Sequence, residues 1–240
     1  MDLLERLQGI IAIFLSQSVF FGVGLSILGY QIGLLIKNKV KLAIANPLLI
    51  AILFVIFGLW LSGVDYESYS DGTRYLSYLL TPATVCLAIP LYSQSDKLRR
   101  CWKAVVAGIV AGALTNLICI FLFALFFRFT HEQYVTLLPK SVTTAIGMAI
   151  SGELGGIQSV TVAAIIFTGI FGHIAGEHIL KAARVRDPIA RGIAIGTGAH
   201  AIGTARALEL GETEGAMSSL SIVLTGILTV ILAPLFAMLH

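Results

Sequence analysis

The stretch DPIARGIAIGTGAHAIGTARALE, residues 187–209, decides how this chain folds. It lies between two strongly apolar segments, which places it at membrane depth or very near it. Yet it carries ionisable side chains such as His200 and Arg206 among several glycines. Ionisable groups inside a bilayer are expensive and usually face a bundle interior or a wet cavity. Glycines at this density let helices pack closely or unwind. The stretch therefore predicts a membrane protein that handles a small polar solute.

Composition supports the same class for the whole chain. The 240 residues are 57% hydrophobic and 12% charged, with a mean hydropathy of +0.92. A soluble domain carries about 25% charged residues. Long apolar runs recur throughout, which predicts a polytopic all-α integral membrane protein. The net charge of +3 is concentrated in short loops and indicates orientation, not binding to nucleic acid. The apolar stretch after MDLLERLQ is too long for a signal peptide, so we expect a retained first helix.

We expect about seven hydrophobic segments in one polytopic domain, residues 1–240. Continuous helices are predicted at about 10–36, 47–62, 104–127, 157–180 and 218–239. The segment 75–92 contains Pro82 and Pro90, which disfavour a continuous helix. The segment 138–156, LPKSVTTAIGMAISGELGG, has an apolar part too short for about 30 Å of hydrocarbon. It is predicted to be broken or re-entrant.

Loop charges predict an orientation. Three basic loops are expected in the cytoplasm, at 37–41, 97–103 and 181–186. Two acidic loops are expected outside, at 65–71 and 209–214. The N-terminus is then outside and the C-terminus inside, provided that 138–156 does not cross the membrane. If it does cross, one charge cluster is misplaced.

Three short matches, all about 141–144 residues apart, indicate an internal repeat. They pair GYQIG at 29–33 with GHIAG at 172–176, Asn46-Pro47 with Asp187-Pro188, and IPLY at 89–92 with APLF at 233–236. The pattern favours a duplicated, transporter-like architecture with broken helices. Its halves are residues 10–95 and 157–238, linked by 96–156.

LPKSVTT is the first candidate site. It places Lys140 beside Ser141, Thr143 and Thr144, next to a helix-breaking proline. If a helix starts at Ser141, its free amides and positive dipole end point at the same place as the ammonium group. Such an arrangement suits a carboxylate. In the structural alternative, Lys140 extends to the interface and the hydroxyls cap a helix.

GTGAHAIGTARA is the second candidate site. Gly196 and Gly198 permit unwinding, Thr204 offers a hydroxyl, and Arg206 could bind a carboxylate with two parallel hydrogen bonds. His200 could donate to the solute or carry a coupling proton. In the alternative, the glycines serve tight packing, His200 is hydrogen-bonded inside, and Arg206 lies at the outer interface.

The remaining ionisable groups give weaker signals. Glu153 could carry a proton, pair with Lys140, or be an ordinary loop carboxylate. Asp187 and Arg191 are explained by a helix cap and an i,i+4 ion pair. The histidines of HIAGEH are spaced i,i+5 and point to different faces, so no metal site is expected. No nucleophile–base pair appears, and we expect neither a cofactor nor an enzyme.

These motifs resemble the LrgB/CidB family of membrane proteins. The resemblance rests on LPKSVTT, RDPIARG, TPATVCLAIPLY and especially GTGAHAIGTARALELGE, and it covers nearly the whole chain. Ala145 stands where the family commonly has proline, and GAHAIG replaces the more usual ASHGIG, which changes the expected geometry of the breaks.

The resemblance implies two functions at the bacterial inner membrane. Bacterial members are described as holin-like or antiholin-like modulators of murein hydrolase activity and lysis, acting with a small LrgA/CidA-type partner. Plastid relatives resemble glycolate/glycerate transporters, and bacterial ones have been linked to pyruvate. By resemblance the substrate-binding candidates are Lys140, Ser141, Thr143, Thr144, His200, Gly203, Thr204 and Arg206.

The residues favour transport of a small monocarboxylate over a nonselective pore, which needs no converging cation and hydroxyls. Lys140 and Arg206 would attract the carboxylate, and the hydroxyls would bind its oxygens. His200 or Glu153 would carry a coupling proton. The alternative is a holin/antiholin-like modulator of murein hydrolase activity and cell lysis. Besides the solute, the LrgA/CidA-type partner and the bilayer, the glycine-rich faces suggest self-association into a homo-oligomer.

Overall fold

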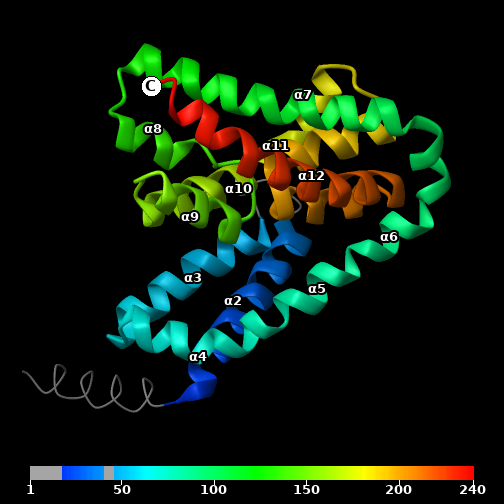
Figure 1. Cartoon of the computed structure of the whole chain (residues 1–240). Coiled ribbons are helices and arrows are strands. Elements are labelled where there is room, and N and C mark those ends of the chain that lie inside the picture. The colour runs from blue at the N-terminus through cyan, green and yellow to red at the C-terminus, as the bar shows by residue number, and fades with distance from the viewer. Residues whose placement is uncertain (1–17, 41–45) are drawn as a thin grey trace, which may run out of the picture. The chain divides into compact units, whose positions relative to one another are not determined.

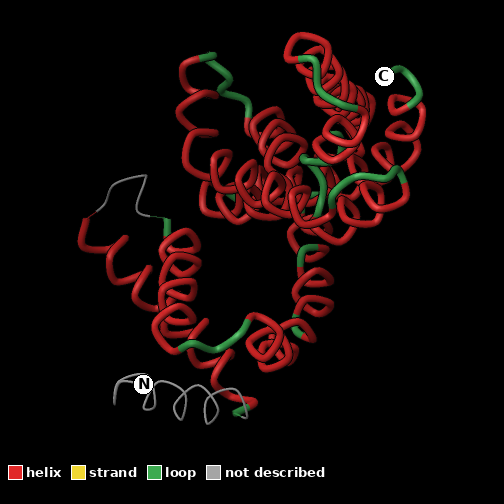
Figure 2. The backbone as a smooth tube through the Cα atoms, turned by 90° about the vertical axis from the view of Figure 1, so that its left-hand side faces the viewer, coloured by secondary structure: helices red, strands yellow, loops and turns green. Residues whose placement is uncertain are grey.

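The computed structural model describes residues 18–40 and 46–240. Within these residues the chain is helical and contains no strand (Figure 2). Four of the described helices are long and apolar enough to cross a membrane: 20–40, 95–127, 158–182 and 212–237. The prediction of an all-α integral membrane protein is confirmed. By internal contacts the chain divides into two units, residues 1–86 and 87–240, which we describe separately.

The first unit contains α2 (Val19–Val40), α3 (Pro47–Ser62), α4 (Tyr66–Tyr78) and α5 (Leu80–Cys86). The α3 helix begins where predicted, because the Asn46 side chain accepts a hydrogen bond from the Leu48 amide at 2.8 Å. Gly33 lets α2 and α3 touch, since a Cβ at this position would lie 2.5 Å from the Pro47 carbonyl oxygen. Residues 10–17 of the predicted first helix lie outside the described residues.

The second unit contains α6 (Ala88–Ser93), α7 (Ser95–Phe127), α8 (His131–Leu137), α9 (Thr144–Glu153), α10 (Gln158–Ala182), α11 (Pro188–Leu210) and α12 (Glu212–Ala237) (Figure 1). The α7 and α12 helices run in the same direction. At one end the Lys97 Nζ donates a hydrogen bond to the Thr213 Oγ1 at 2.8 Å. At the other end His131, just after α7, lies with its Nδ1 3.2 Å from the His240 carbonyl oxygen.

Three segments that the sequence predicts as loops are largely helical. Of the segment 64–74, residues 66–74 form most of α4, which Asp65 caps by accepting a hydrogen bond from the Ser68 amide at 3.0 Å. Residues 95–103 form the first turns of α7, which the backbone of Cys101 (φ −123°, ψ 20°) separates from the apolar remainder. Residues 212–214 open α12, where acidic side chains favour the positive helix end. The predicted break around Pro82 and Pro90 is confirmed, because α5 and α6 are separate short helices.

The α11 helix folds back on itself at His200. This residue has φ 42° and ψ −139°, which interrupts the helix between a first arm, 188–199, and a second arm, 201–210. A Cβ at Gly203 would lie 2.5 Å from the Ala199 Cβ and 3.2 Å from the Ile195 carbonyl oxygen. In a straight helix residues eight apart are separated by about 12 Å. The arms therefore form a hairpin with its tip at His200.

Contacts with α12 show the course of both arms. A Cβ at Gly192 would lie 2.5 Å from the Glu214 carbonyl oxygen, and one at Gly196 would lie 2.5 Å from the Ser218 carbonyl oxygen. The first arm is thus parallel to α12. The second arm returns, since Thr204 Oγ1 lies 2.7 Å from Ser218 Oγ. Both ends of α11 therefore lie on the same face of the unit, and neither arm alone is long enough to span a bilayer.

A second hairpin, formed by α8 and α9, enters from the opposite face. The Tyr134 hydroxyl donates to the Phe236 carbonyl at 3.0 Å, near the end of α12. The chain then turns at Pro139 and Lys140 and returns through α9. The Ile157 amide donates to Thr136 Oγ1 at 2.9 Å, so the start of α10 lies beside α8 again. Neither α8 nor α9 is long enough to span a bilayer, in agreement with the predicted broken segment.

The hairpins change the predicted orientation of the loops. We name the face with residues 95–103, 181–191 and 209–214 the basic face, and the face with residues 128–134 and 237–240 the C-terminal face. Lys97 contacts Thr213, and Leu180 and Leu210 belong to one cluster. The prediction that 209–214 lies opposite the basic loops is therefore wrong, because α11 returns to the side from which it enters. The C-terminus then lies opposite the basic loops, not with them.

A buried apolar cluster lies in the part of the second unit near the C-terminal face. It joins α7, α8, α9 and α12 through Leu117, Ile120, Ala124, Tyr134, Val135, Leu138, Ile150, Ala233 and Ala237. Tyr134 and Val135 are fully buried, so the first turns of α8 anchor the α8–α9 hairpin in this cluster. The tip of the hairpin lies deeper in the unit.

Candidate functional site

The tip of the α8–α9 hairpin carries Lys140, which is half-buried. Its Nζ donates to Ser141 Oγ at 3.0 Å and approaches Asn116 Oδ1 of α7 at 3.5 Å. Among the residues that the structure describes, Lys140 is not in any of the ion pairs. A half-buried ammonium group held only by neutral oxygens can accept an anion.

Asn116 connects the two hairpins. Its Nδ2 donates to the Thr197 carbonyl at 2.9 Å, close to the end of the first arm of α11. Asn116 is not among the site residues predicted from the sequence. A signal was present, because an amide side chain inside the apolar run of a membrane helix usually has a partner within the bundle.

We call the place where Lys140, Asn116 and Thr197 meet the junction of the two hairpins. Two helices start beside it. The α9 helix starts at Thr144, and Thr143 occupies the N-cap position without a side-chain hydrogen bond. A start at Ser141, which the carboxylate-binding interpretation considered, is therefore not observed. Ser141 is buried, and Thr143 and Thr144 are half-buried. The second arm of α11 starts just after His200. The first amides of a helix lack intrahelical acceptors and carry the positive end of its dipole, so both starts favour negative charge.

His200 holds the α11 hairpin in place. It is 3% exposed, and its Nε2 lies 2.9 Å from the Ile165 carbonyl oxygen of α10. The Thr204 hydroxyl donates to the His200 carbonyl at 2.9 Å. Buried Gly203 lets the arms approach each other. The break predicted at Gly196 and Gly198 lies instead at His200; both glycines are helical.

Arg206 and Glu153 lie away from the junction. Arg206 pairs with Glu177 of α10 and with Glu209, and Glu177 also binds Lys181 at 2.6 Å. These groups lie toward the basic face. Glu153 is the exposed last residue of α9, at the end remote from the hairpin tip, and forms no described ion pair with Lys140.

Two polar contacts stabilise the start of α11. Asp187 accepts a hydrogen bond from the Ala190 amide at 2.9 Å, as expected of a cap. The expected partner of Arg191 was Asp187, but Arg191 pairs with buried Glu214 of α12 at 3.4 Å. The hairpin brings Glu214 beside the first turn of α11. Among the described residues, no group of three or more His, Cys, Asp or Glu side chains could hold a metal ion.

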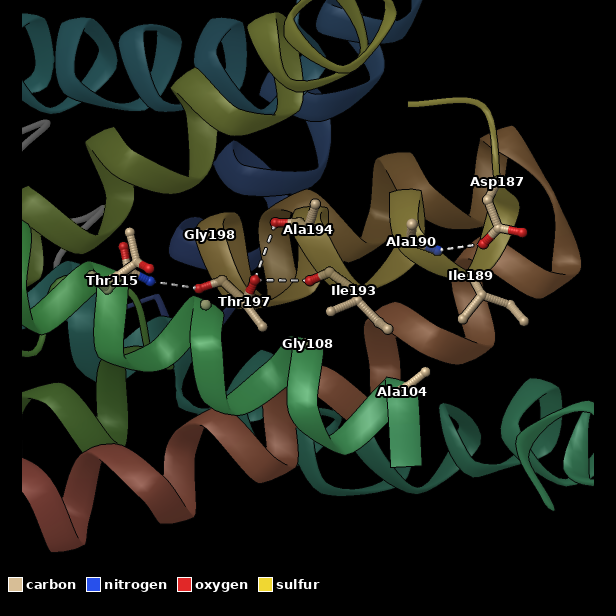
Figure 3. Close-up of a pocket in the computed structure, with 12 residues that line it drawn as sticks. Ala104, Gly108, Thr115, Asp187, Ile189, Ala190, Ile193, Ala194, Thr197 and Gly198 are labelled. Atoms are coloured by element: carbon tan, nitrogen blue, oxygen red, sulfur yellow. Dashed lines mark hydrogen bonds between the residues drawn. The ribbon is translucent and has the colours of Figure 1, made fainter. Parts of the chain in front are cut away.

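A cavity of about 510 Å³ is lined by residues of α7 and of the first arm of α11 (Figure 3). Small residues such as Ala104, Gly108 and Gly198 form its walls, and Asp187 marks its end at the basic face. Thr197 and Asn116 line its inner end. The cavity therefore runs from the basic face to the junction of the two hairpins.

Comparisons with known proteins agree on one family. Residues 26–239 match the LrgB-like family. The chain is 37% identical over 222 residues to the antiholin-like protein LrgB of Bacillus cereus (strain B4264), covering 92% of this chain and 96% of that protein. The same values hold for the antiholin-like protein LrgB of Bacillus anthracis (strain CDC 684 / NRRL 3495). Neither name is that of an enzyme. No solved structure matches the chain.

Proposed function

Because the chain belongs to the LrgB-like family and is a multi-pass protein of the bacterial membrane, we propose that it carries a small monocarboxylate across that membrane. The observation that supports this most is that Asn116 of α7 joins the two hairpins, approaching Lys140 of one and donating to Thr197 of the other. Broken helices whose N-termini meet near mid-membrane are the usual way in which secondary transporters bind anionic groups.

Each group at the junction has a proposed role. The Lys140 ammonium and the free amides at the start of α9 bind the carboxylate. Ser141, Thr143 and Thr144 bind its oxygens or the hydroxyl of a hydroxy acid such as glycolate or glycerate; pyruvate is a further candidate. His200 is the proposed carrier of a coupling proton. We assign Arg206 to holding α11 against α10, since two carboxylates already occupy it.

Modulation of murein hydrolase activity and lysis is the second candidate function, favoured by the antiholin-like names of the relatives. In this case the chain acts through contact with an LrgA/CidA-type membrane protein. Polar substitutions at the hairpin tips then leave its activity unchanged, whereas loss of the partner abolishes it.

Uptake of radiolabelled glycolate, glycerate and pyruvate into proteoliposomes tests the proposal. The chain is reconstituted alone and with an LrgA-type partner, with and without a pH gradient. We expect saturable uptake that Lys140→Ala lowers by at least about tenfold, or 1.4 kcal/mol. Asn116→Asp should have a similar effect, because it places a carboxylate beside Nζ at the position where the solute binds.

Lys103→Ala is the matched control, since Lys103 is an exposed cation of α7 outside the junction. It should retain wild-type uptake. If saturable uptake is retained in both Lys140→Ala and Asn116→Asp, the junction does not bind the transported solute. Leakage of unrelated dyes would indicate a pore, and no flux in any arrangement would leave the antiholin-like function.

A further inference from the structure

Thr225 of α12 carries a hydroxyl that the fold leaves without a partner. The residue is 2% exposed, and its Oγ1 has no hydrogen-bond partner among the described residues. The neighbouring hydroxyls of α12 donate hydrogen bonds to backbone carbonyls of the same helix. Ser221 Oγ donates to the Met217 carbonyl at 2.7 Å, and Thr229 Oγ1 donates to the Thr225 carbonyl at 2.7 Å. A buried polar atom without a partner costs free energy, so it calls for an explanation.

The register of α11 against α12 locates this hydroxyl. A Cβ at Gly196 would lie 2.5 Å from the Ser218 carbonyl and 2.7 Å from the Ser221 Cβ. The first arm and α12 are parallel, so the next turn of α12 brings Thr225 to the level of the hairpin tip at His200. Ser218, Ser221 and Thr225 recur at helical spacing, and all three are buried.

The α8–α9 hairpin also contacts α12 near Thr225. A Cβ at Gly226, next to Thr225, would lie 3.0 Å from the Ile146 Cδ1 in the first turn of α9. Thr225 is therefore buried where the first turn of α9 and the tip of α11 both pack on α12. Asn116 contacts the same two hairpins from α7.

We propose that the Thr225 hydroxyl donates a hydrogen bond to an oxygen of the transported carboxylate, and so completes the binding site from the α12 side. This inference rests on the proposed function. Lys140 supplies charge for the anion, and Thr225 supplies a directional donor. A site that uses a buried hydroxyl in this way keeps the donor unpaired until the solute arrives, and it discriminates against solutes that lack an oxygen in that position.

Thr225→Val tests the inference, because valine has the shape of threonine without the hydroxyl. The variant protein is reconstituted, and both its thermal unfolding midpoint and its uptake of glycolate are measured. We expect an unfolding midpoint that is unchanged or raised, since an unpaired buried hydroxyl is removed. The KM for uptake should rise about tenfold. Thr225→Ser, which keeps the donor, should retain most of the uptake.

Thr229→Val is the matched control, one turn further along α12, where the hydroxyl is bonded to the helix backbone. It should leave the KM unchanged. Wild-type KM in Thr225→Val would overturn the inference and leave only a packing defect, with the proposed function intact. Absence of saturable uptake in the wild-type protein would overturn the proposed function and this inference together.

Discussion

At the scale of single residues, His200 combines a buried side chain with an unfavourable backbone. Its positive φ lies in a region that residues other than glycine rarely adopt, and such conformations persist only where the surroundings enforce them. The surroundings here are the Ile165 carbonyl, which contacts the imidazole, and Thr204, which donates to the His200 carbonyl. The side chain thus stabilises a turn that its own Cβ disfavours.

This balance predicts that His200→Ala is less stable than His200→Gly. Both variants lose the contact with Ile165, but alanine retains the Cβ that disfavours positive φ. The difference should be about 1 kcal/mol, the cost of the left-handed region less the greater flexibility of unfolded glycine. Thermal unfolding in detergent measures it. Ala201→Gly, in the helical second arm, should show the reverse sign. Equal stability of the two His200 variants would mean that the turn is not strained.

At the scale of elements, the glycines of α11 serve two different purposes. Gly196 lies against α12, where a Cβ would be 2.5 Å from the Ser218 carbonyl oxygen. Gly198, only two residues later, has no atom within 4 Å of the position of a Cβ and lines the cavity beside α7. One glycine permits contact between helices, and the other keeps space between them.

Alanine substitution should therefore separate the two glycines. Gly196→Ala forces the first arm away from the α12 backbone and should destabilise the protein by about 1–3 kcal/mol. Gly198→Ala meets no atom and removes a helix-interior glycine, so its stability should be unchanged or raised by up to about 1 kcal/mol. Unfolding midpoints of the two variants, measured side by side, check this order. A Gly196→Ala variant as stable as the wild type would show that the two helices are not in close contact.

The elements also show how far the sequence alone could lead. Asn46-Pro47 and Asp187-Pro188 predicted the starts of α3 and α11, because a cap and a first-turn proline are local signals. Pro82, Pro90 and the short 138–156 segment correctly predicted breaks. The hairpin in α11 could not be foreseen, since its arms are defined by contacts with α12 and α10. Asn116 and Thr225 were missed because only the fold brings them to the hairpins.

At the scale of the whole molecule, the re-entrant course of α11 reverses one inference from loop charge. Counting 181–210 as a crossing put the acidic loop 209–214 outside. A hairpin returns to the face from which it enters, so this loop joins the basic loops despite its charge. The positive-inside rule depends on Lys and Arg and is little affected by Asp and Glu. We therefore predict that the basic face, with Lys97, Arg184 and Arg186, is the cytoplasmic face of the second unit.

This orientation predicts a sidedness that thiol labelling can measure. In a background in which Cys86, Cys101 and Cys119 are replaced by serine, single variants Arg186→Cys, Glu212→Cys and Met238→Cys are made at exposed positions. A membrane-impermeant maleimide should label Met238→Cys in intact cells. It should label Glu212→Cys and Arg186→Cys only in inside-out vesicles. Arg186→Cys is the control for the cytoplasmic side, because its basic loop is expected in the cytoplasm whether or not α11 crosses the membrane.

If Glu212→Cys is labelled in intact cells while Arg186→Cys is not, α11 crosses the membrane and the hairpin at His200 does not exist. The proposed site would then lose one of its two converging helix starts.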